Sequence, residues 1–321
     1  MKIKMLYADI KSDIEVIENE LEQALNSSSH LLNDASVHLL QAGGKRIRPV
    51  FTLLSAKFGD YNIDRMKNIA VPLELIHMGS LVHDDVIDNS DMRRGRETVK
   101  AQWNNRVAMY TGNFIFARAL QYVTSIENPR AHQILAKTMV ELVNGEVIQI
   151  EDKFRLDQSL KDYFRRIKRK TALLIESSCE LGAVVSGADE KTARHLKRYG
   201  YFVGMSFQIV DDILDFTATD KQLGKPAGSD LMNGNVTLPI LLMKDDPQLA
   251  PYLTKVAEAG LTEEERQSML ALVRDSEAIK EATHISNLYL KKALKEIEAL
   301  PKHPMKKKLR DIALFMGKRK S

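Results

Sequence analysis

The sequence predicts an all-α protein that folds as one domain over residues 1–321. Apolar residues recur at spacings of three and four through most of the chain, as in helices with one buried face, and few windows alternate as strands do. Leu, Ala, Lys and Glu are abundant and favour helix, whereas 16 Gly and 9 Pro are too few for the turns of a β-sandwich or barrel. An apolar fraction of 44% with 28% charged residues is typical of globular chains and excludes a disordered one.

Breaks rich in glycine, asparagine and proline separate the predicted helices into groups. In chain order, two helices precede Gly43–Gly44, and two more lie between that break and the segment Asn89–Gly95. Two follow before Asn128–Pro129, three reach the stretch Leu223–Asn235 with its three glycines, and four complete the chain. The predicted helices cover residues 7–27, 31–42, 46–58, 63–88, 97–108, 110–126, 130–154, 159–186, 189–217, 236–244, 262–274, 277–299 and 303–318.

Charge and cysteine content limit the classes of function. The net charge of +4 is small for 321 residues, so it does not argue for nucleic acid, and we expect no nucleic-acid partner. Positive charge gathers in the segment 302–321, which is either a solvated basic face or a contact with an anionic membrane surface. Its charged residues are Lys302, Lys306, Lys307, Lys308, Arg310, Lys318, Arg319 and Lys320, against the single acid Asp311.

The chain carries no signal of export. Cys179 is the only cysteine, so no intrachain disulfide can form, and it lies in an apolar run as a small core residue would. The first residues turn acidic before any apolar stretch of a signal peptide begins, and no stretch approaches 18 uncharged apolar residues. We therefore expect a cytoplasmic protein that contacts a membrane at most peripherally.

Two Asp-Asp-x-x-Asp motifs stand in apolar surroundings, within residues 81–88 and 208–215. In each motif the first and third aspartates are four residues apart and share one helix face, where like charges destabilise a helix by about 0.2–0.5 kcal/mol per pair. A bound cation reverses that sign, and carboxylates without a neighbouring cysteine suit a hard ion such as Mg²⁺. One such motif arises by chance in about one chain in fifteen of this length, and two in roughly one in several hundred, so we predict metal sites. The six residues are Asp84, Asp85, Asp88, Asp211, Asp212 and Asp215.

Cationic residues near these motifs suit phosphate groups. Residues 43–49, GGKRIRP, place two glycines and three cations at a probable helix start, where backbone N–H groups and basic side chains bind anions. Alone this segment is equally a basic surface turn. Arg93 and Arg94 follow Asp88 closely, and further polar residues lie near the second motif or on neighbouring helices. Each has an ordinary alternative, a core histidine for His77 and a solvated face for Lys170, but together they supply what two diphosphates and their metals require.

At this point the motifs resemble those of the trans-isoprenyl diphosphate synthase family, and the likeness runs over nearly the whole chain. Its most specific pieces are GGKRIRPVF (43–51), ELIHMGSLVHDDVIDNSDMRRG (74–95), RRIKRKTALLIESSCELGA (165–183), GMSFQIVDDILDF (204–216) and LGKPAGSDLMNGNVTLP (223–239). The motifs resemble in particular those of the catalytic component II of two-subunit bacterial members. The resemblance implies an isoprenoid synthase-type helical bundle around a central catalytic cavity that both motifs face.

The resemblance also implies roles for individual residues. The six aspartates would hold Mg²⁺ on an allylic diphosphate, with Asp84, Asp88, Asp211 and Asp215 as metal ligands. The allylic diphosphate would be bound by Arg93, Lys170, Thr171, Gln208 and Lys225, and isopentenyl diphosphate by Lys45, Arg48, His77 and Arg94. Gly79 and Ser80, at the expected cavity floor below the first motif, are small where short-chain members carry aromatics, so a long product tunnel is expected.

The implied activity is that of a prenyltransferase. Isopentenyl diphosphate would be added repeatedly to an allylic diphosphate such as farnesyl diphosphate, to give about six to eight isoprene units, with a heptaprenyl product for the menaquinone side chain favoured. The partner would be a small non-catalytic component I, a second copy in a dimer, or both. Open alternatives are a homodimeric octaprenyl or nonaprenyl synthase and a class I terpene cyclase. A non-catalytic regulatory chain is disfavoured, because all six aspartates are present.

Overall fold

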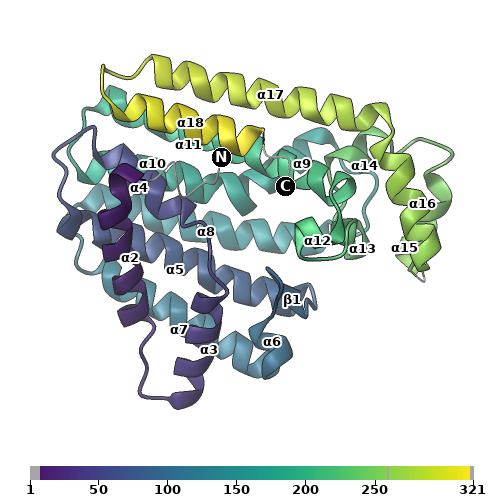
Figure 1. Ribbon diagram of the computed structural model, residues 1–321, viewed down its shortest axis with the longest axis horizontal. Coiled ribbons are helices and arrows are strands. Elements are labelled where there is room, and N and C mark those ends of the chain that lie inside the picture. The colour runs from purple at the N-terminus through teal and green to yellow at the C-terminus, as the bar shows by residue number, and fades with distance from the viewer. Residues whose placement is uncertain (1–7, 259, 319–321) are drawn as a thin grey trace. The chain divides into compact units, whose positions relative to one another are not determined.

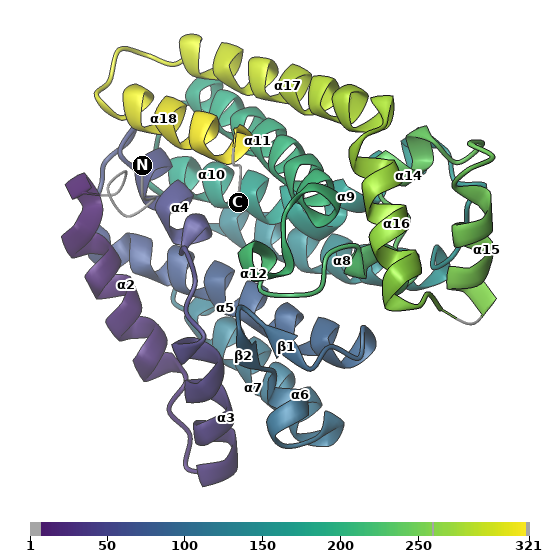
Figure 2. The same cartoon turned by 45° about the vertical axis from the view of Figure 1, so that its right-hand side comes forward.

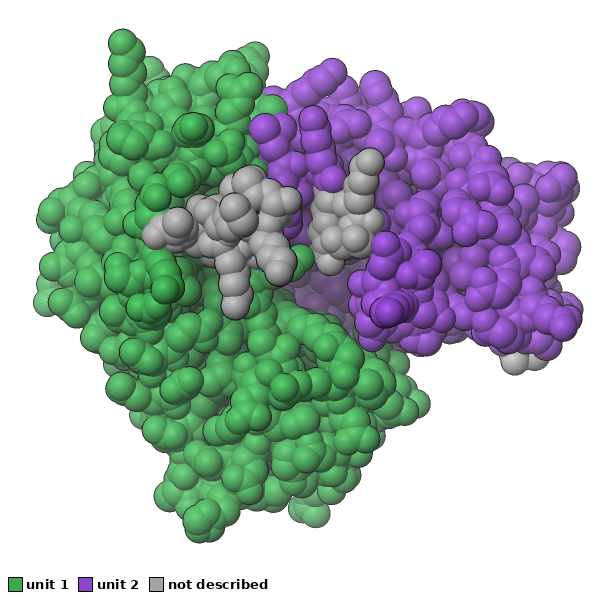
Figure 3. Space-filling model, viewed as in Figure 1, with its two compact units in different colours: residues 1–140, 174–200, 294–312 green, residues 141–173, 201–293, 313–321 purple. Residues whose placement is uncertain are grey.

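The protein is almost entirely helical, as the sequence predicts. The computed structural model describes residues 8–258 and 260–318, so the predicted helix residue 7 and the basic residues Arg319 and Lys320 lie outside the described part. The chain divides into two compact units, coloured separately in Figure 3: unit 1 with residues 1–140, 174–200 and 294–312, and unit 2 with residues 141–173, 201–293 and 313–321. The expected single domain and central cavity remain predictions.

The elements are labelled in Figure 1 and follow one another along the chain. Their bounds are η1 Ala8–Ile10, α2 Lys11–Ala24, α3 His30–Gln41, α4 Ile47–Ala56, α5 Ile63–Ile87, β1 Met92–Arg93, β2 Arg96–Glu97, α6 Val99–Gln102, α7 Asn105–Val123, α8 Pro129–Glu151, α9 Leu160–Ile167, η2 Lys168–Ala172, α10 Leu173–Val185, α11 Glu190–Thr217, α12 Asp220–Leu223, α13 Ser229–Met232, α14 Leu238–Leu242, α15 Ala250–Glu258, α16 Glu263–Arg274, α17 Glu277–Glu298 and α18 Met305–Gly317.

Unit 1 is built around α5. This helix buries residues on most of its circumference and packs against α2, α4 and α7, and it runs alongside α7 (Figure 1, Figure 2). Gly79 of α5 and Gly112 of α7 allow a close approach of the two helices. A Cβ atom at Gly112 would lie 2.2 Å from His83 Nε2, and one at Gly79 would lie 3.2 Å from the Phe116 ring. These glycines therefore set the spacing between α5 and α7.

Unit 2 has its own apolar core. Tyr163 of α9, Ile209 and Phe216 of α11, Leu238 of α14 and Met269 of α16 are all buried within it. Each large apolar side chain buried in this way stabilises the fold by about 1.5–3 kcal/mol. The core thereby holds the second aspartate motif of α11 against α9 and the short helices that follow it.

One predicted helix is wrong, and one is interrupted. Residues 97–108 form no single helix, because the Asn104 side chain accepts a hydrogen bond from the Val107 N–H at 3.0 Å and starts α7 there. The predicted helix 159–186 remains helical but passes through the π-helical turn η2 at residues 168–172. The hairpin β1–β2 and the helices α12, α13 and α15 were not predicted.

None of the helices in the described part of the chain is both long and apolar enough to cross a membrane.

Candidate active site

The first aspartate motif lies at the C-terminal end of α5. Asp84 and Asp85 belong to its last turn and are buried, while Asp88 follows as the capping residue and is half-buried. The Asp88 N–H donates to Asp84 O at 2.8 Å, which continues the helical hydrogen bonding to this residue. Asp84 and Asp88 thus keep the one-turn spacing that the sequence predicts.

Asp85 is held by a cation that the sequence assigns to diphosphate. Arg93 Nη2 lies 2.7 Å from Asp85 Oδ1, and Arg93 Nε donates to the same oxygen at 2.8 Å. Burial raises the pKa of the Asp85 carboxyl, and Arg93 offsets this only in part. Arg93 stands on β1, and the turn to β2 uses Arg94 and Gly95 in the left-handed region, with φ of 53° and 75°. The hairpin therefore brings Arg93 back to the motif.

Arg46 is one of the three cations that the sequence places in the phosphate-binding segment, but in the structure it holds the basic loop before α4. Arg46, the residue before α4, has φ 46° and ψ 38°, a left-handed conformation that is unusual for a residue with a side chain. Its guanidinium is 7% exposed and forms a two-pronged pair with Glu18 of α2, at 2.7 and 3.0 Å, and a further pair with Glu74 of α5 at 3.3 Å. Arg46 is thus neutralised by two carboxylates and fixes the loop between Lys45 and Arg48.

Three of the four residues expected to bind isopentenyl diphosphate influence one another electrostatically. Burial lowers the pKa of Arg48 to about 10, although Glu74 opposes the shift. Burial and the cations Arg48 and Arg94 lower the pKa of His77 well below its usual value, so the imidazole is neutral. Arg94 donates to Gly43 O. Lys45, the fourth of these residues, is exposed at the loop.

A buried donor in this cluster lacks a partner. Arg48 Nε is buried and has no hydrogen-bond acceptor among the described residues. Glu74 Oε2 is likewise buried and has no hydrogen-bond donor among them. Buried polar atoms are normally satisfied, and leaving one unpaired costs about 1–3 kcal/mol. An anion that accepts from Arg48 would satisfy the guanidinium, which fits the predicted phosphate site.

The two residues predicted as the tunnel floor have different contacts. Gly79 faces α7, where the Phe116 ring and Gly112 O lie 3.2 and 3.3 Å from the position of a Cβ atom. Ser80 is half-buried and donates to His77 O at 2.9 Å within its own helix. The small size of Gly79 is therefore required by helix packing, whereas that of Ser80 is not explained by such a contact.

The second motif lies near the end of α11, and its three aspartates have different surroundings. Asp211 is half-buried, while Asp212 and Asp215 are 2% and 1% exposed. Asp212 accepts from the Tyr163 hydroxyl at 2.6 Å and from Gln208 Nε2 at 2.8 Å, one donor on each oxygen. Burial raises the pKa of the Asp212 carboxyl to about 7 despite these bonds.

The Asp215 carboxylate contacts a cation and a backbone amide. Lys225 Nζ lies 3.0 Å from Asp215 Oδ1, and the Asp230 N–H donates to Asp215 Oδ2 at 3.2 Å. Lys225 also pairs with Asp230 at 2.7 Å. Burial and the nearby Asp230 charge raise the pKa of Asp215. The loop after α12 thus folds back over the motif and brings Lys225 to it, as the sequence predicts for a residue of the same site.

The remaining predicted residues lie in the π-helical turn or beside it. Thr171 Oγ1 donates to Gln208 Oε1, which orients the Gln208 amide toward Asp212. Lys170 Nζ donates to Gln149 Oε1 at 2.6 Å. A π-turn shifts the side chains that follow it around the helix, and such turns are frequent at functional sites. The structure thus joins Thr171, Gln208 and Asp212 in one hydrogen-bonded chain within unit 2.

Sequence reasoning missed three supporting residues, Glu74, Tyr163 and Asp230, and the structural role of Arg46. Arg46 lies inside the quoted GGKRIRPVF segment, and Asp230 lies inside LGKPAGSDLMNGNVTLP, so their position in specific motifs was a usable signal. Tyr163 lies on α9, seven residues before Lys170 of the π-helical turn, and only the fold shows that it reaches Asp212.

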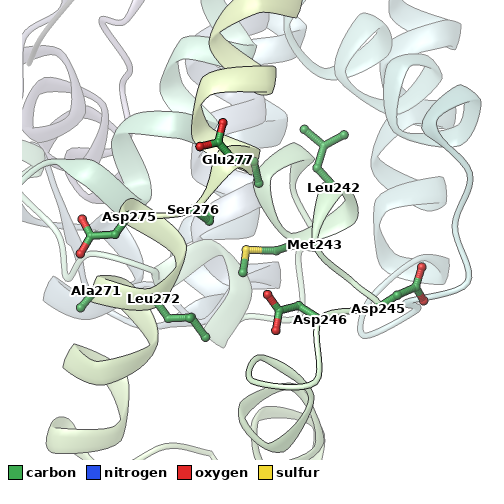
Figure 4. Close-up of a pocket in the computed structure, with 10 residues that line it drawn as sticks. Leu242, Met243, Asp245, Asp246, Ala271, Leu272, Asp275, Ser276 and Glu277 are labelled. Atoms are coloured by element: carbon green, nitrogen blue, oxygen red, sulfur yellow. The ribbon is translucent and has the colours of Figure 1, made fainter.

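One cavity in unit 2 is separate from these residues. It has a volume of about 690 Å³, and Figure 4 shows Leu242, Met243 and Leu272 together with acidic side chains around it. Asp275 and Glu277 on its edge already pair with Arg274 and Lys280. None of the predicted site residues lines this cavity, so it contributes nothing to the site.

The carboxylates fit a hard divalent metal that takes part of its ligands from elsewhere. Within residues 8–258 and 260–318, no group of three or more His, Cys, Asp or Glu is arranged to enclose a metal ion. Mg²⁺ prefers one or two protein carboxylates completed by water and phosphate oxygens, so paired aspartates in each unit suit it when a diphosphate is bound.

Comparisons with known proteins agree with this chemistry. The chain matches the Polyprenyl synthetase family over residues 29–273. It is 53% identical over 320 residues to heptaprenyl diphosphate synthase component 2 of Geobacillus stearothermophilus, and the alignment covers 99% of each chain. The crystal structure of heptaprenyl diphosphate synthase from Staphylococcus aureus aligns with a TM-score of 0.91 at 44% identity, covering 97% of this chain and 99% of that one.

A polyprenyl synthase from Caulobacter crescentus CB15, solved in complex with calcium and isoprenyl diphosphate, aligns with a TM-score of 0.94 at 30% identity. That alignment covers 100% of this chain and 98% of the other. The all-α fold and the resemblance inferred from the motifs are thereby confirmed, and the chain belongs to the polyprenyl synthetase family.

Proposed function

We propose that this prenyltransferase is the catalytic subunit of a heptaprenyl diphosphate synthase. It would extend farnesyl diphosphate by successive head-to-tail addition of isopentenyl diphosphate, to supply the side chain of menaquinone. The observation that carries the proposal is the pair of aspartate motifs in a chain 53% identical, over 99% of its length, to a protein named heptaprenyl diphosphate synthase component 2.

The aspartates would act on the allylic diphosphate through Mg²⁺. Asp84, Asp88, Asp211 and Asp215 would be the ligands, and the bound metal would supply positive charge opposite the departing diphosphate. In the structure Lys225 Nζ lies 3.0 Å from Asp215 Oδ1 and forms an ion pair with it. A diphosphate would attract the Lys225 ammonium to itself, which frees an oxygen of Asp215 for a metal.

Two sets of cationic and hydrogen-bonding residues would separate the two substrates. Arg93, Lys170, Thr171, Gln208 and Lys225 would hold the allylic diphosphate. Lys45, Arg48, His77 and Arg94 would hold isopentenyl diphosphate, and the unpaired Arg48 Nε and the neutral His77 support this assignment. Neutral His77 donates a hydrogen bond to an anion without adding charge to an already cationic cluster.

The reaction needs no side-chain nucleophile. The carbon–oxygen bond of the allylic diphosphate breaks and diphosphate leaves with the electron pair. The double bond of isopentenyl diphosphate then forms a new carbon–carbon bond to the allylic cation, and a proton is lost, to the released diphosphate as the family resemblance implies. The protein residues stabilise the negative charge on the leaving group and exclude water, which would otherwise capture the cation.

A second chain is part of the proposal. The partner would be a small component I, as the term component 2 in the name of the Geobacillus relative suggests, with self-association as the alternative. Val143, Val147 and Ile150 of α8 are exposed at spacings of four and three, so they form an apolar stripe on this helix. Exposed apolar stripes are typical of surfaces that bind another chain, which supports association through α8.

The test is a product assay. The purified chain is incubated with Mg²⁺, farnesyl diphosphate and radiolabelled isopentenyl diphosphate, with and without a candidate small subunit from the same genome, and products are separated by chain length. We expect heptaprenyl diphosphate only when both subunits are present. Octaprenyl or nonaprenyl product from the chain alone would instead make it a homodimeric synthase, and no incorporation in either case would contradict the proposal.

A further inference from the structure

Tyr163 is a wholly buried residue whose hydroxyl is committed to the second aspartate motif. Its side chain is 0% exposed, and its hydroxyl donates to Asp212 Oδ2 at 2.6 Å. A hydroxyl that donates to a carboxylate over so short a distance forms a charge-assisted hydrogen bond, which is stronger than one between neutral groups. Removal of this hydroxyl would leave a buried carboxylate oxygen without its donor.

The other oxygen of Asp212 is also occupied. Gln208 Nε2 donates to Asp212 Oδ1 at 2.8 Å, and Thr171 donates to Gln208 Oε1. The amide orientation of Gln208 follows from these two bonds, because the Asp212 carboxylate only accepts and so faces the amide NH2, which leaves the amide oxygen for the Thr171 hydroxyl. Asp212 is therefore fixed from α9 on one side and from the π-helical turn η2 on the other.

Tyr163 is itself held rigidly. The Ser159–Asp162 capping box starts α9 one turn before it, with Asp162 N donating to Ser159 Oγ at 3.2 Å. The Arg166 guanidinium lies 5.8 Å from the centre of the Tyr163 ring and donates to Val236 O. The ring of Phe164 packs edge-on at 5.3 Å. A residue held at this many points can transmit a fixed position to its hydrogen-bond partner.

The aspartates on either side of Asp212 have other surroundings. Asp211 is half-buried, and Asp215 lies 3.0 Å from the ammonium of Lys225, which also pairs with Asp230. Asp211 precedes Asp212 by one residue and Asp215 follows it by three, so the rotation of this turn of α11 about the helix axis orients both side chains. An anchor on Asp212 sets that rotation, and so sets the direction in which Asp211 and Asp215 present their oxygens.

We propose that Tyr163 is a positioning residue for the metal-binding aspartates of α11, acting through Asp212, which serves as an anchor and not as a metal ligand. The inference rests on the proposed function, since the ligands it positions are those of the Mg²⁺–diphosphate site. Residues that orient metal ligands in this way typically change metal affinity by 10- to 100-fold when they are substituted.

The test compares two buried tyrosines in the full-length chain. Tyr163→Phe removes the hydroxyl on Asp212, and the control Tyr199→Phe removes an equally buried hydroxyl that donates to Leu309 O at 2.7 Å, away from any predicted site residue. Isothermal titration calorimetry measures binding of inorganic diphosphate in the presence of Mg²⁺, and thermal unfolding measures stability. Steady-state kinetics measure KM separately for the allylic substrate and for isopentenyl diphosphate.

We expect Tyr163→Phe to weaken binding of Mg²⁺–diphosphate by about tenfold or more, and to raise KM for the allylic substrate, with KM for isopentenyl diphosphate unchanged. Tyr199→Phe should lower the unfolding temperature and leave both binding and KM unchanged. Binding that is the same in Tyr163→Phe and wild type, or an equal loss in both variants, would overturn the inference. Wild-type protein that binds no Mg²⁺–diphosphate would instead contradict the proposed function, and the inference with it.

A second pair of variants tests whether Asp212 is an anchor or a metal ligand if Tyr163→Phe does not fold. Asp212→Asn keeps one oxygen that accepts from Tyr163, so the bond to α9 survives although the bond from Gln208 is lost, whereas a metal ligand does not survive the change. We expect Asp212→Asn to retain Mg²⁺–diphosphate binding within about tenfold of wild type, and Asp211→Asn to lose more than about a hundredfold. Equal losses in the two variants would show that Asp212 is a ligand like its neighbour and would overturn the inference.

Discussion

Single carboxylates carry the proposed chemistry, and the residues around each carboxylate determine its proposed role. The spacing in the sequence marks all six aspartates as candidates, because like charges four residues apart in an apolar setting are stabilised by a bound cation. Sequence alone does not show what sets Asp85 and Asp212 apart from the four aspartates that are expected to bind metal. The structure does, because Asp85 pairs with Arg93 and Asp212 accepts from Tyr163, contacts that depend on residues brought together by the fold.

Asp211→Ala tests the metal assignment at the residue scale. We expect condensation to fall by more than about a hundredfold, because the charge on the leaving diphosphate loses its counter-ion. Circular dichroism should show unchanged helical content. The matched control is Asp64→Ala, which removes an exposed aspartate from the first turn of α5. Turnover that persists in Asp211→Ala would refute the assignment.

Arg46→Lys tests whether Arg46 shapes the basic loop. Lysine keeps the positive charge but cannot make the two-pronged pair with Glu18, so Lys45 and Arg48 lose their fixed placement. We expect KM for isopentenyl diphosphate to rise by about ten- to a hundredfold, with KM for farnesyl diphosphate unchanged.

The control for Arg46→Lys is Arg65→Lys, the same change at an exposed arginine that pairs with Asp60. An equal rise of both KM values in Arg46→Lys would mean general loss of structure, and no rise in either would exclude a role for the loop.

At the scale of elements, periodicity was sufficient for long helices and insufficient for short ones. Helices such as α5 and α11 begin and end within two residues of the predicted bounds. Helices of four residues, such as α12 and α13, are too short to show a period. The break at Asn104 was misplaced because one side-chain hydrogen bond decides it, and the apolar pattern continues through it.

The contact of α5 with α7 leads to a prediction about product length. Ser80→Phe adds bulk where no close helix contact explains the small residue, and we expect products shorter by at least one isoprene unit with stability retained. Gly79→Phe should instead destabilise the protein by about 1–3 kcal/mol, because Phe116 and Gly112 already meet this position.

Chromatography of labelled products and thermal unfolding separate these two outcomes. An unchanged product length in Ser80→Phe would show that residue 80 does not line the tunnel.

At the scale of the whole molecule, the sequence predicted the fold class and the family, because both rest on patterns that extend over nearly all of the chain. The family match over residues 29–273 and the full-length relatives confirm them. The association of chains was not predictable in the same way. The apolar residues of the stripe on α8 recur with the spacing of any amphipathic helix, so the sequence alone does not tell whether they face the core or the solvent. Their exposure in the folded chain shows that they face the solvent.

The double substitution Val143→Asp, Val147→Asp tests association. Charges on the stripe should prevent binding of the second chain, so we expect sedimentation to show a monomer and the formation of long products to fall by at least about tenfold. Leu288→Asp, at an exposed position on α17, is the control and should change neither. Unchanged sedimentation of the double variant would assign association to another surface.

The central claim is that both aspartate motifs act on one allylic diphosphate through divalent metal. Crystals of the chain grown with Mn²⁺ and a non-hydrolysable farnesyl diphosphate analogue test it most directly, because anomalous scattering locates the metal without reference to the protein. We predict Mn²⁺ on Asp84 and Asp88 and on Asp211 and Asp215, with every ion bound to oxygens of the same diphosphate. Metal at only one motif, or a diphosphate bound with Lys225 still on Asp215 and no metal beside it, would contradict the account.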